Sequence, residues 1–270
     1  MTKIKLRSYH LVNREERFYC MLIAHCLLSS KSAREGFAKV VHDEAGLPGI
    51  FSNSSEFEVF MEVAALRDYW RELGDPKRYD PAIEQARRDF LEKALRWVNG
   101  LEDGAKVGWS QSPPDLLDKK RGSPFWTEKK DGSPNKLCSP ALWPIKKLNK
   151  ADSTRPCVER LKRLRWAFNA KPDLLVLGGQ HGVLIEVKVE SGGGQNKDGY
   201  KQLPTQANIL SLWKHFDLPG LNGNISLVTL GKGPKPSGSE HHMKWKQLIE
   251  GIGVKNMDPF TARCLGRFNG

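Results

Sequence analysis

The stretch that most constrains the fold is residues 172–190, PDLLVLGGQHGVLIEVKVE. Two apolar runs of strand length flank a glycine-rich turn, a pattern typical of a buried β-hairpin. Asp173 opens the first run, and the returning run carries Glu186 and Lys188. Because side chains alternate along a strand, Glu186 and Lys188 point to the same face. The hairpin therefore places charged groups within an otherwise apolar element.

The spacing predicts that the two acids lie close together. A five-residue turn at 178–182 would place Asp173 opposite Val187, and a bulge would align it with Glu186. Burying two close carboxylates is costly unless a cation pairs with them. Mg²⁺ and Mn²⁺ prefer such oxygen ligands. We therefore expect a metal site made by Asp173, Glu186 and the backbone carbonyl of Val187, with Lys188 beside the attacking water or the phosphate.

The alternative interpretation is structural. Glu186 and Lys188 could form a solvated ion pair on an edge strand. This interpretation is less favoured, because the residues around them, 183–189, otherwise form a continuous apolar run.

Pro172-Asp173 and Glu186-Val187-Lys188, separated by a strand, a turn and a strand, resemble the signature of the PD-(D/E)xK nuclease superfamily. The resemblance covers residues 155–232 and one earlier helix. It implies a restriction-endonuclease-like core in which Asp173 and Glu186 bind the metal and Lys188 is the catalytic lysine.

The same resemblance implies two further catalytic positions. Members of the superfamily often carry an acid on the helix before the sheet, for which Glu16 is the candidate, followed by Glu15. They also often carry a glutamine or tyrosine on the helix after the hairpin. Gln206 is the candidate there, followed by Gln202 and Tyr200.

The predicted fold class is α/β: a mixed, mainly antiparallel central sheet flanked by helices, with a helical N-terminal part. Asn13 and Glu16 have the spacing of a capping box, which predicts a helix ending near residue 30. The other predicted helices are 55–73, 81–99, 200 or 203 to 215, and 240–250. The predicted strands are 163–168, 173–177, 183–190 and 224–230. We expect three regions: 1–103, helical; 104–157, basic, proline-rich and irregular; and 158–270, the nuclease core.

The charge of the chain favours a polyanionic partner. Its 43 basic and 31 acidic residues give a net charge of +12. The segment from Lys119 to Lys171 contains 15 basic and 4 acidic residues, and so holds most of this excess. Basic side chains neutralise phosphates, so we expect nucleic acid to lie along this segment. The candidate contacts are Lys119, Lys120, Arg121, Lys146, Lys147, Arg163 and Arg165.

Phe125, Trp126, Trp143 and Trp166 are interleaved with these basic residues. Exposed aromatic rings could stack on unpaired bases. We favour the alternative that the tryptophans dock onto the hydrophobic core.

Other classes of protein lack support in the sequence. The five cysteines show no CxxC pair, so neither a zinc site nor an iron–sulfur cluster is expected, and a reduced, cytoplasmic setting fits best. No apolar run is long enough to cross a membrane, and no phosphate-binding loop, HExxH helix or GxSxG elbow is present.

The sequence thus predicts a Mg²⁺- or Mn²⁺-dependent nuclease, with DNA favoured over RNA and a role in defence against foreign DNA. Endonuclease and exonuclease activity are both open, as are a homodimer and a larger complex. The alternatives are a nucleic-acid-binding protein without catalysis, or a subunit of a defence, recombination or transposition complex that is active only with a partner.

Overall fold

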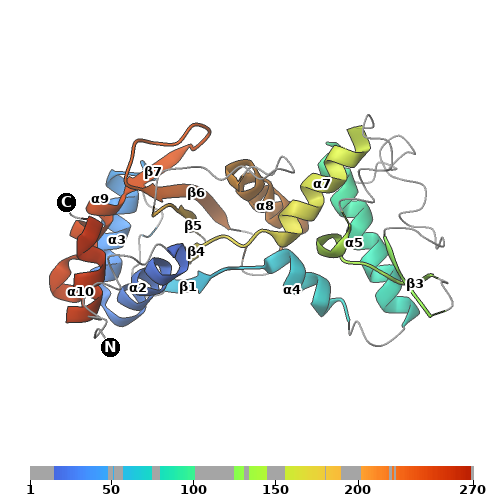
Figure 1. Cartoon of the computed structure of the whole chain (residues 1–270), viewed down its shortest axis with the longest axis horizontal. Coiled ribbons are helices and arrows are strands. Elements are labelled where there is room, and N and C mark those ends of the chain that lie inside the picture. Colours follow the sequence, from blue (N-terminus) through green and yellow to red (C-terminus); the bar gives the residue numbers. More distant parts are fainter. Residues whose placement is uncertain are drawn as a thin grey trace, which may run out of the picture. The chain divides into compact units, whose positions relative to one another are not determined.

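The computed structural model describes residues 15–47, 51, 57–74, 80–100, 125–130, 134–144, 156–179, 181–189, 202–218, 221 and 223–268. Over these residues the chain is an α/β protein with a mixed five-stranded sheet flanked by helices (Figure 1). It divides into two compact units. The sheet unit comprises Met1–Val63, Lys171–Pro204 and Asn222–Gly270, and the helical unit comprises Ala64–Ala170 and Thr205–Leu221. The three regions predicted from composition stay a prediction.

The sheet has the strand order β1-β4-β5-β6-β7. β1 pairs antiparallel with β4 and β4 antiparallel with β5, whereas β6 runs parallel to β5 and β7 parallel to β6. The predicted mixed sheet is therefore confirmed, whereas the prediction that it is mainly antiparallel is wrong, because β6 and β7 both pair in parallel. The strands are β1 (Phe57–Met61), β4 (Leu174–Gly178), β5 (His181–Val187), β6 (Asn224–Gly231) and β7 (His241–Lys244).

One face of this sheet packs on helices of the same unit (Figure 1). These helices are α2 (Glu16–Ser29), α3 (Lys31–Asp43), α9 (Trp245–Ile252) and α10 (Pro259–Leu265), with the short turns η3 (Val254–Asn256) and η4 (Gly266–Phe268). Val176, Ile185 and Val228 are fully buried in the core that they share. The opposite face of the central strands is buried as well, at Leu175 and Leu184. Burial on both faces explains why these strands are continuous apolar runs.

Two glycines allow α3 and α9 to approach each other closely. A Cβ atom on Gly36 would lie 1.8 Å from the carbonyl oxygen of Gly251. A Cβ atom on Gly251 would lie 2.2 Å from a methyl group of Val40. Any larger residue at either position would push the two helices apart.

The predicted helix at 55–73 is wrong in its first part. Residues 57–61, FEVFM, form strand β1, and only Ala65–Glu72 forms a helix, α4. The side chains of β1 alternate between half-buried and exposed, as expected of an edge strand. The predicted helix at 240–250 has the same fault, because its first residues pair with β6 as strand β7 before α9 begins.

The predicted strand at 163–168 is also wrong, since these residues lie within helix α7 (Pro156–Asn169). Leu161, Leu164 and Phe168 are buried, and their spacing of three and four residues is that of one helix face. Trp166, which a strand would align with Leu164 and Phe168, is only half-buried. The third antiparallel strand is therefore β1, from a distant part of the chain.

The predicted capping box is wrong. Helix α2 begins at Glu16 itself, with Glu15 in the N-cap position and no side-chain cap. Asn13 lies outside the described residues. Glu16 therefore stands in the first turn, where its carboxylate interacts favourably with the helix dipole.

The helical unit contains α4, α7, α5 (Pro81–Asn99) and most of α8 (Gln202–Phe216). It also contains the two-stranded sheet of β2 (Trp126–Glu128) and β3 (Pro134–Leu137), followed by η2 (Pro140–Leu142). The predicted α5 is confirmed at both ends: Asp80 caps its first turn, and Gly100 ends it with φ 66°. The predicted helix before residue 215 is confirmed as α8.

Aromatic residues form the core of the helical unit. The ring of Phe90 stacks on Phe216 with centroids 4.1 Å apart and meets Trp70 and Phe168 edge to face. Trp126 and Trp143 are buried, which confirms for these two the prediction that the tryptophans dock onto the core, whereas Trp166 is only half-buried. Across the part of the chain that the structure describes, no helix is both long and apolar enough to cross a membrane.

Candidate active site

The hairpin of β4 and β5 has a tighter turn than the sequence predicted. Gly178 pairs directly with His181, so only two residues separate the strands, and Gly179 takes a left-handed conformation with φ 66°. The predicted five-residue turn is therefore wrong, and the register moves by one step. Leu174 pairs with Ile185, so the next position along the ladder sets Asp173 opposite Glu186. The two acids are aligned without the predicted bulge.

Asp173 is held by the backbone on both sides. Its Oδ2 accepts a hydrogen bond of 2.8 Å from the amide of Val187, and its carbonyl oxygen accepts one of 3.4 Å from the amide of Glu62. Burial raises the pKa of the Asp173 carboxyl above its ordinary value, and the charge of Glu16 adds to this effect. The Val187 amide and the Lys188 charge oppose it. The carboxyl group is thus fixed in position and largely removed from solvent.

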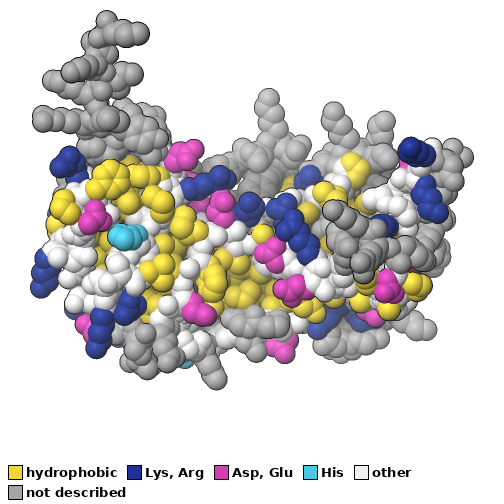
Figure 2. Space-filling view, turned by 90° about the horizontal axis from the view of Figure 1, so that it is seen from below, with side chains coloured by type: hydrophobic (Ala, Val, Ile, Leu, Met, Phe, Trp, Pro, Cys, Tyr) yellow, Lys and Arg dark blue, Asp and Glu magenta, His cyan; other side chains and the backbone are white. Residues whose placement is uncertain are grey.

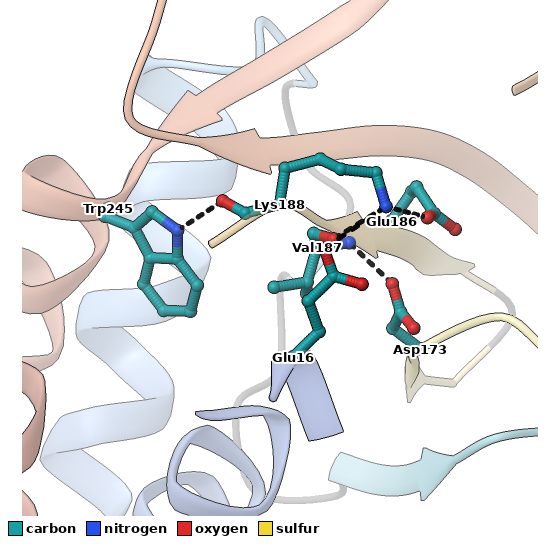
Figure 3. A network of polar contacts seen from close by, with 6 residues as sticks. All are labelled: Glu16, Asp173, Glu186, Val187, Lys188 and Trp245. Atoms are coloured by element: carbon teal, nitrogen blue, oxygen red, sulfur yellow. Dashed lines mark hydrogen bonds and ion pairs between the residues drawn. The ribbon is translucent and has the colours of Figure 1, made fainter. Parts of the chain in front are cut away.

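The Lys188 ammonium lies between oxygen atoms from two elements (Figure 3). Its Nζ is 2.6 Å from Glu186 Oε1 and 3.5 Å from Glu16 Oε1, and it donates a hydrogen bond of 3.0 Å to the carbonyl of Val187. The side chain of Glu186 is only 1% exposed. Burial by itself lowers the pKa of Lys188, but the carboxylates, Glu186 first, outweigh it, so that this pKa is raised.

Lys188 lies just beyond the end of β5 and is still held firmly. Its amide donates a hydrogen bond of 2.7 Å to the carbonyl of Leu230, and its own carbonyl accepts one of 3.0 Å from the indole of Trp245 (Figure 3). Trp245 is a residue of this site that sequence reasoning missed. No motif marks it, and only the packing of α9 brings it to the hairpin.

A polar row continues across the sheet from the acid pair. Thr229 of β6 pairs with Glu186 and is buried, and His242 of β7 pairs with Thr229. The imidazole Nδ1 of His242 lies 2.9 Å from Thr229 Oγ1, and its Nε2 lies 3.1 Å from the carbonyl of Gly233. The sequence offered only the pair of histidines at 241–242 as a signal, because the row depends on the pairing of β5, β6 and β7.

The oxygen atoms of the site suit a hard divalent cation. Asp173 and Glu186 offer carboxylates, and Val187 offers a carbonyl. Mg²⁺ is usually bound by one or two carboxylates, with water and substrate phosphate completing its shell. Within the described residues, no three His, Cys, Asp or Glu side chains form a ready metal cage. The donor set therefore fits a site with two carboxylates rather than a closed cage.

Among the remaining predicted catalytic positions, Glu16 is in contact with this site. Glu16 stands at the start of α2 and reaches Lys188, as described above. Gln206 lies in α8 and is buried in the helical unit, so its role at the site stays a prediction. Gln202 is the first residue of α8, and Tyr200 lies outside the described residues.

The structure describes two of the seven predicted nucleic-acid contacts, Arg163 and Arg165, and both lie on α7. Arg163 is exposed and donates a hydrogen bond of 3.2 Å to Asn208 Oδ1. Arg165 is half-buried and donates one of 2.6 Å to the carbonyl of Trp143, a contact that serves packing. Figure 2 shows Lys, Arg, Asp and Glu side chains interspersed over the described surface in that view. The other five candidates, Lys119, Lys120, Arg121, Lys146 and Lys147, lie outside the described residues.

No protein-family model, curated protein or solved structure matches this chain. The geometry of the site and the chemistry of its side chains therefore indicate the function.

Proposed function

We propose that this chain is a metal-dependent nuclease of the PD-(D/E)xK type, which hydrolyses phosphodiester bonds in DNA. The observation that carries this proposal is the alignment of Asp173 with Glu186 at the end of a buried hairpin, with Lys188 in contact with Glu186. The order of elements supports it: α2 precedes the antiparallel strands β1, β4 and β5, and α8 lies between β5 and the parallel strand β6. Further helices and the β2–β3 sheet are inserted ahead of β4. A restriction-endonuclease-like core has this arrangement.

In the proposed site, Asp173, Glu186 and the carbonyl of Val187 hold Mg²⁺ or Mn²⁺. When bound, the cation would act as a Lewis acid that polarises the phosphate, and it would lower the pKa of a water molecule. The amide of Val187 fixes one oxygen of Asp173, and the carboxyl group also interacts with that of Glu186, so both acids adjoin the place proposed for the cation.

Lys188 supplies the positive charge that this chain itself brings to the phosphate. An ammonium group close to the phosphate stabilises the negative charge that grows there in the transition state. Because Glu186 is nearly inaccessible to solvent, water screens the charges of the site only weakly. Trp245 and Leu230 fix the backbone of Lys188, so that the side chain alone needs to move.

The charge of the chain supports a nucleic acid as the substrate. A net charge of +12 attracts a polyanion, and the exposed Arg163 lies within the most basic segment. DNA as the substrate, a role in defence against foreign DNA, a cytoplasmic location and action as a homodimer or within a larger complex belong to the same proposal.

A cleavage assay tests the proposal. Purified protein is incubated with supercoiled, linear and single-stranded DNA and with RNA, in Mg²⁺, Mn²⁺ or EDTA. Asp173→Asn, Glu186→Gln and Lys188→Met should each lower the rate about 100-fold or more, because each removes a group that stabilises the transition state. Lys31→Met is the matched control, since Lys31 contacts Glu35 instead of the acid pair and lies outside the basic segment. It should cut at nearly the wild-type rate.

Two outcomes would contradict the proposal. Cutting by Glu186→Gln at the wild-type rate would show that the acid pair is not the active site. Salt-sensitive binding of DNA without cutting in any metal would favour a binding protein without catalysis, or a subunit that requires a partner.

A further inference from the structure

The Lys188 ammonium is surrounded by three oxygen acceptors. They are Glu186 Oε1 at 2.6 Å, the carbonyl oxygen of Val187 at 3.0 Å and Glu16 Oε1 at 3.5 Å (Figure 3). An ammonium group has three N–H donors and accepts no hydrogen bond. These three acceptors can therefore take all of its hydrogen bonds.

Two of these oxygens belong to residues that the proposed function assigns to the divalent cation, Glu186 and Val187. A carboxylate oxygen can accept hydrogen bonds from two donors at once. An ammonium and a divalent cation that both contacted this oxygen would repel each other strongly, because both are positively charged and would lie close together. The repulsion is large here because the side chain of Glu186 is 1% exposed and that of Lys188 is 17% exposed. The ammonium and the cation therefore cannot both occupy this position.

We infer that Lys188 is the built-in counter-ion of the acid pair, and that a divalent cation binds only by displacing its ammonium from Glu186 and Val187. This inference rests on the proposed function, because it concerns the cation of that site. It assigns Lys188 two successive roles. The ammonium first neutralises the acids, and after the cation has bound it is released toward the substrate phosphate. The lysine is thus withheld from the substrate until the cation is in place.

The experiment measures cation affinity and needs no catalysis. The full chain, stripped of metal with EDTA and free of nucleic acid, is titrated with Mn²⁺ by calorimetry. Lys188→Met removes the competing charge and keeps the apolar stem, and it should bind Mn²⁺ about tenfold more tightly or better. Lys31→Met is the matched control. It removes a lysine that contacts Glu35 at 3.8 Å in the same unit, and it should change the affinity less than about threefold.

A second measurement uses thermal unfolding. Without a cation, Lys188→Met removes the ammonium that contacts the buried Glu186, so Mn²⁺ should raise the unfolding temperature of this variant more than that of wild type. If Lys188→Met does not fold, Lys188→Gln replaces it, because its amide can still donate to Glu186. It must show the same gain in affinity. Lys188→Arg keeps the positive charge and should show no gain.

Unchanged or weaker Mn²⁺ binding by both neutral variants would overturn the inference. An equal gain in Lys31→Met would overturn it too, because the effect would then be one of overall charge. The two proposals fail separately. A wild type that cuts DNA while Lys188→Met shows no gain refutes the displacement alone. A gain in affinity in a chain that cuts nothing refutes the nuclease alone.

Discussion

The two units bury charged side chains in different ways. At the end of the sheet, the buried carboxylate of Glu186 contacts the ammonium of Lys188. In the helical unit, the guanidinium of Arg87 is buried, donates a hydrogen bond of 3.0 Å to the carbonyl of Gly74 and lies 5.2 Å from the ring of Trp70. Burial lowers the pKa of Arg87, although a guanidinium stays charged at neutral pH.

This difference separates a chemical role from a structural one. An ion pair between side chains can exchange one partner for another ion, such as a metal. Among the described residues, the Arg87 guanidinium contacts a backbone carbonyl and an aromatic ring, which are both neutral, so we expect it to contribute to packing. We therefore expect substitutions in the Glu186–Lys188 pair to alter chemistry as well as stability, and substitution of Arg87 to alter stability alone.

The largest expected effect is in the aromatic core of the helical unit. Phe90→Ala should lower the free energy of unfolding by about 3–5 kcal/mol, since it leaves a cavity among four aromatic rings. Urea unfolding measures the loss. Leu142→Ala is the control in the same unit, because Leu142 is 70% exposed, and it should change little. Equal losses in the two variants would contradict the assignment of Phe90 to a packed core.

The next effect tests the ion pair of the sheet unit. In EDTA, Lys188→Met should lower the free energy of unfolding by about 2–3 kcal/mol, because it leaves Glu186 buried without its counter-ion. Adding Glu186→Leu to this variant should restore part of the loss, since two apolar side chains of similar size need no counter-ion. The double-mutant cycle, followed by urea unfolding, gives the coupling energy. A coupling near zero would mean that the pair acts as two independent surface groups.

A smaller effect distinguishes two arginines of α7. Arg165→Met should lower the free energy of unfolding by about 1 kcal/mol, because the carbonyl of Trp143 loses this donor. Arg163→Met should leave stability nearly unchanged and reduce the salt dependence of DNA binding by about one ion. Unfolding curves and salt titrations of binding provide the two measurements. The reverse pattern would show that Arg165 contacts DNA and Arg163 serves packing.

The smallest effect is expected at Asp258, an exposed charge that caps α10. Its Oδ1 accepts hydrogen bonds from the amides of Phe260 and Thr261, and the Thr261 side chain together with these amides lowers the pKa of Asp258. A lowered pKa means that the carboxylate stabilises the fold above the ordinary aspartate pKa and that this contribution is lost as the pH falls. Asp258→Ala should lower the unfolding temperature slightly at neutral pH and have less effect in acid.

Asp258→Asn is the control for this cap. Asparagine keeps the hydrogen bonds of the cap and does not titrate, so its stability at neutral pH should be close to that of wild type. An Asp258→Ala effect that grows as the pH falls would contradict the assignment.

The residue types of the site could be predicted from the sequence, whereas the register of the two strands that aligns them could not. The order of an acid, two apolar runs and an acid with a lysine two residues later is local, and alternation along a strand fixes which side chains share a face. The length of the turn depends on Gly179 adopting a left-handed conformation and on the strand pairs that this permits. Several turns between the same two strands are compatible with the sequence, and each sets a different residue opposite Asp173.

Elements were assigned wrongly where their type depends on distant partners. Residues 57–61 form a strand because they pair with β4, more than a hundred positions later in the chain. Residues 241–244 form a strand because β6 offers a free edge. Segments as short as these have too weak a local preference to indicate whether they form a helix or a strand. In α7, an accidental alternation of leucine, tryptophan and phenylalanine concealed a helix.

Local periodicity and composition were enough to predict the α/β class, the buried hairpin, the acids and lysine at its end and the positive charge of the chain. Folding was needed to show that Asp173 faces Glu186, that Glu16 reaches Lys188 from α2, and that Trp245 fixes the lysine backbone. Each of these contacts joins segments far apart in the chain, and only the pairing of strands and the packing of helices on the sheet bring such segments within hydrogen-bond distance.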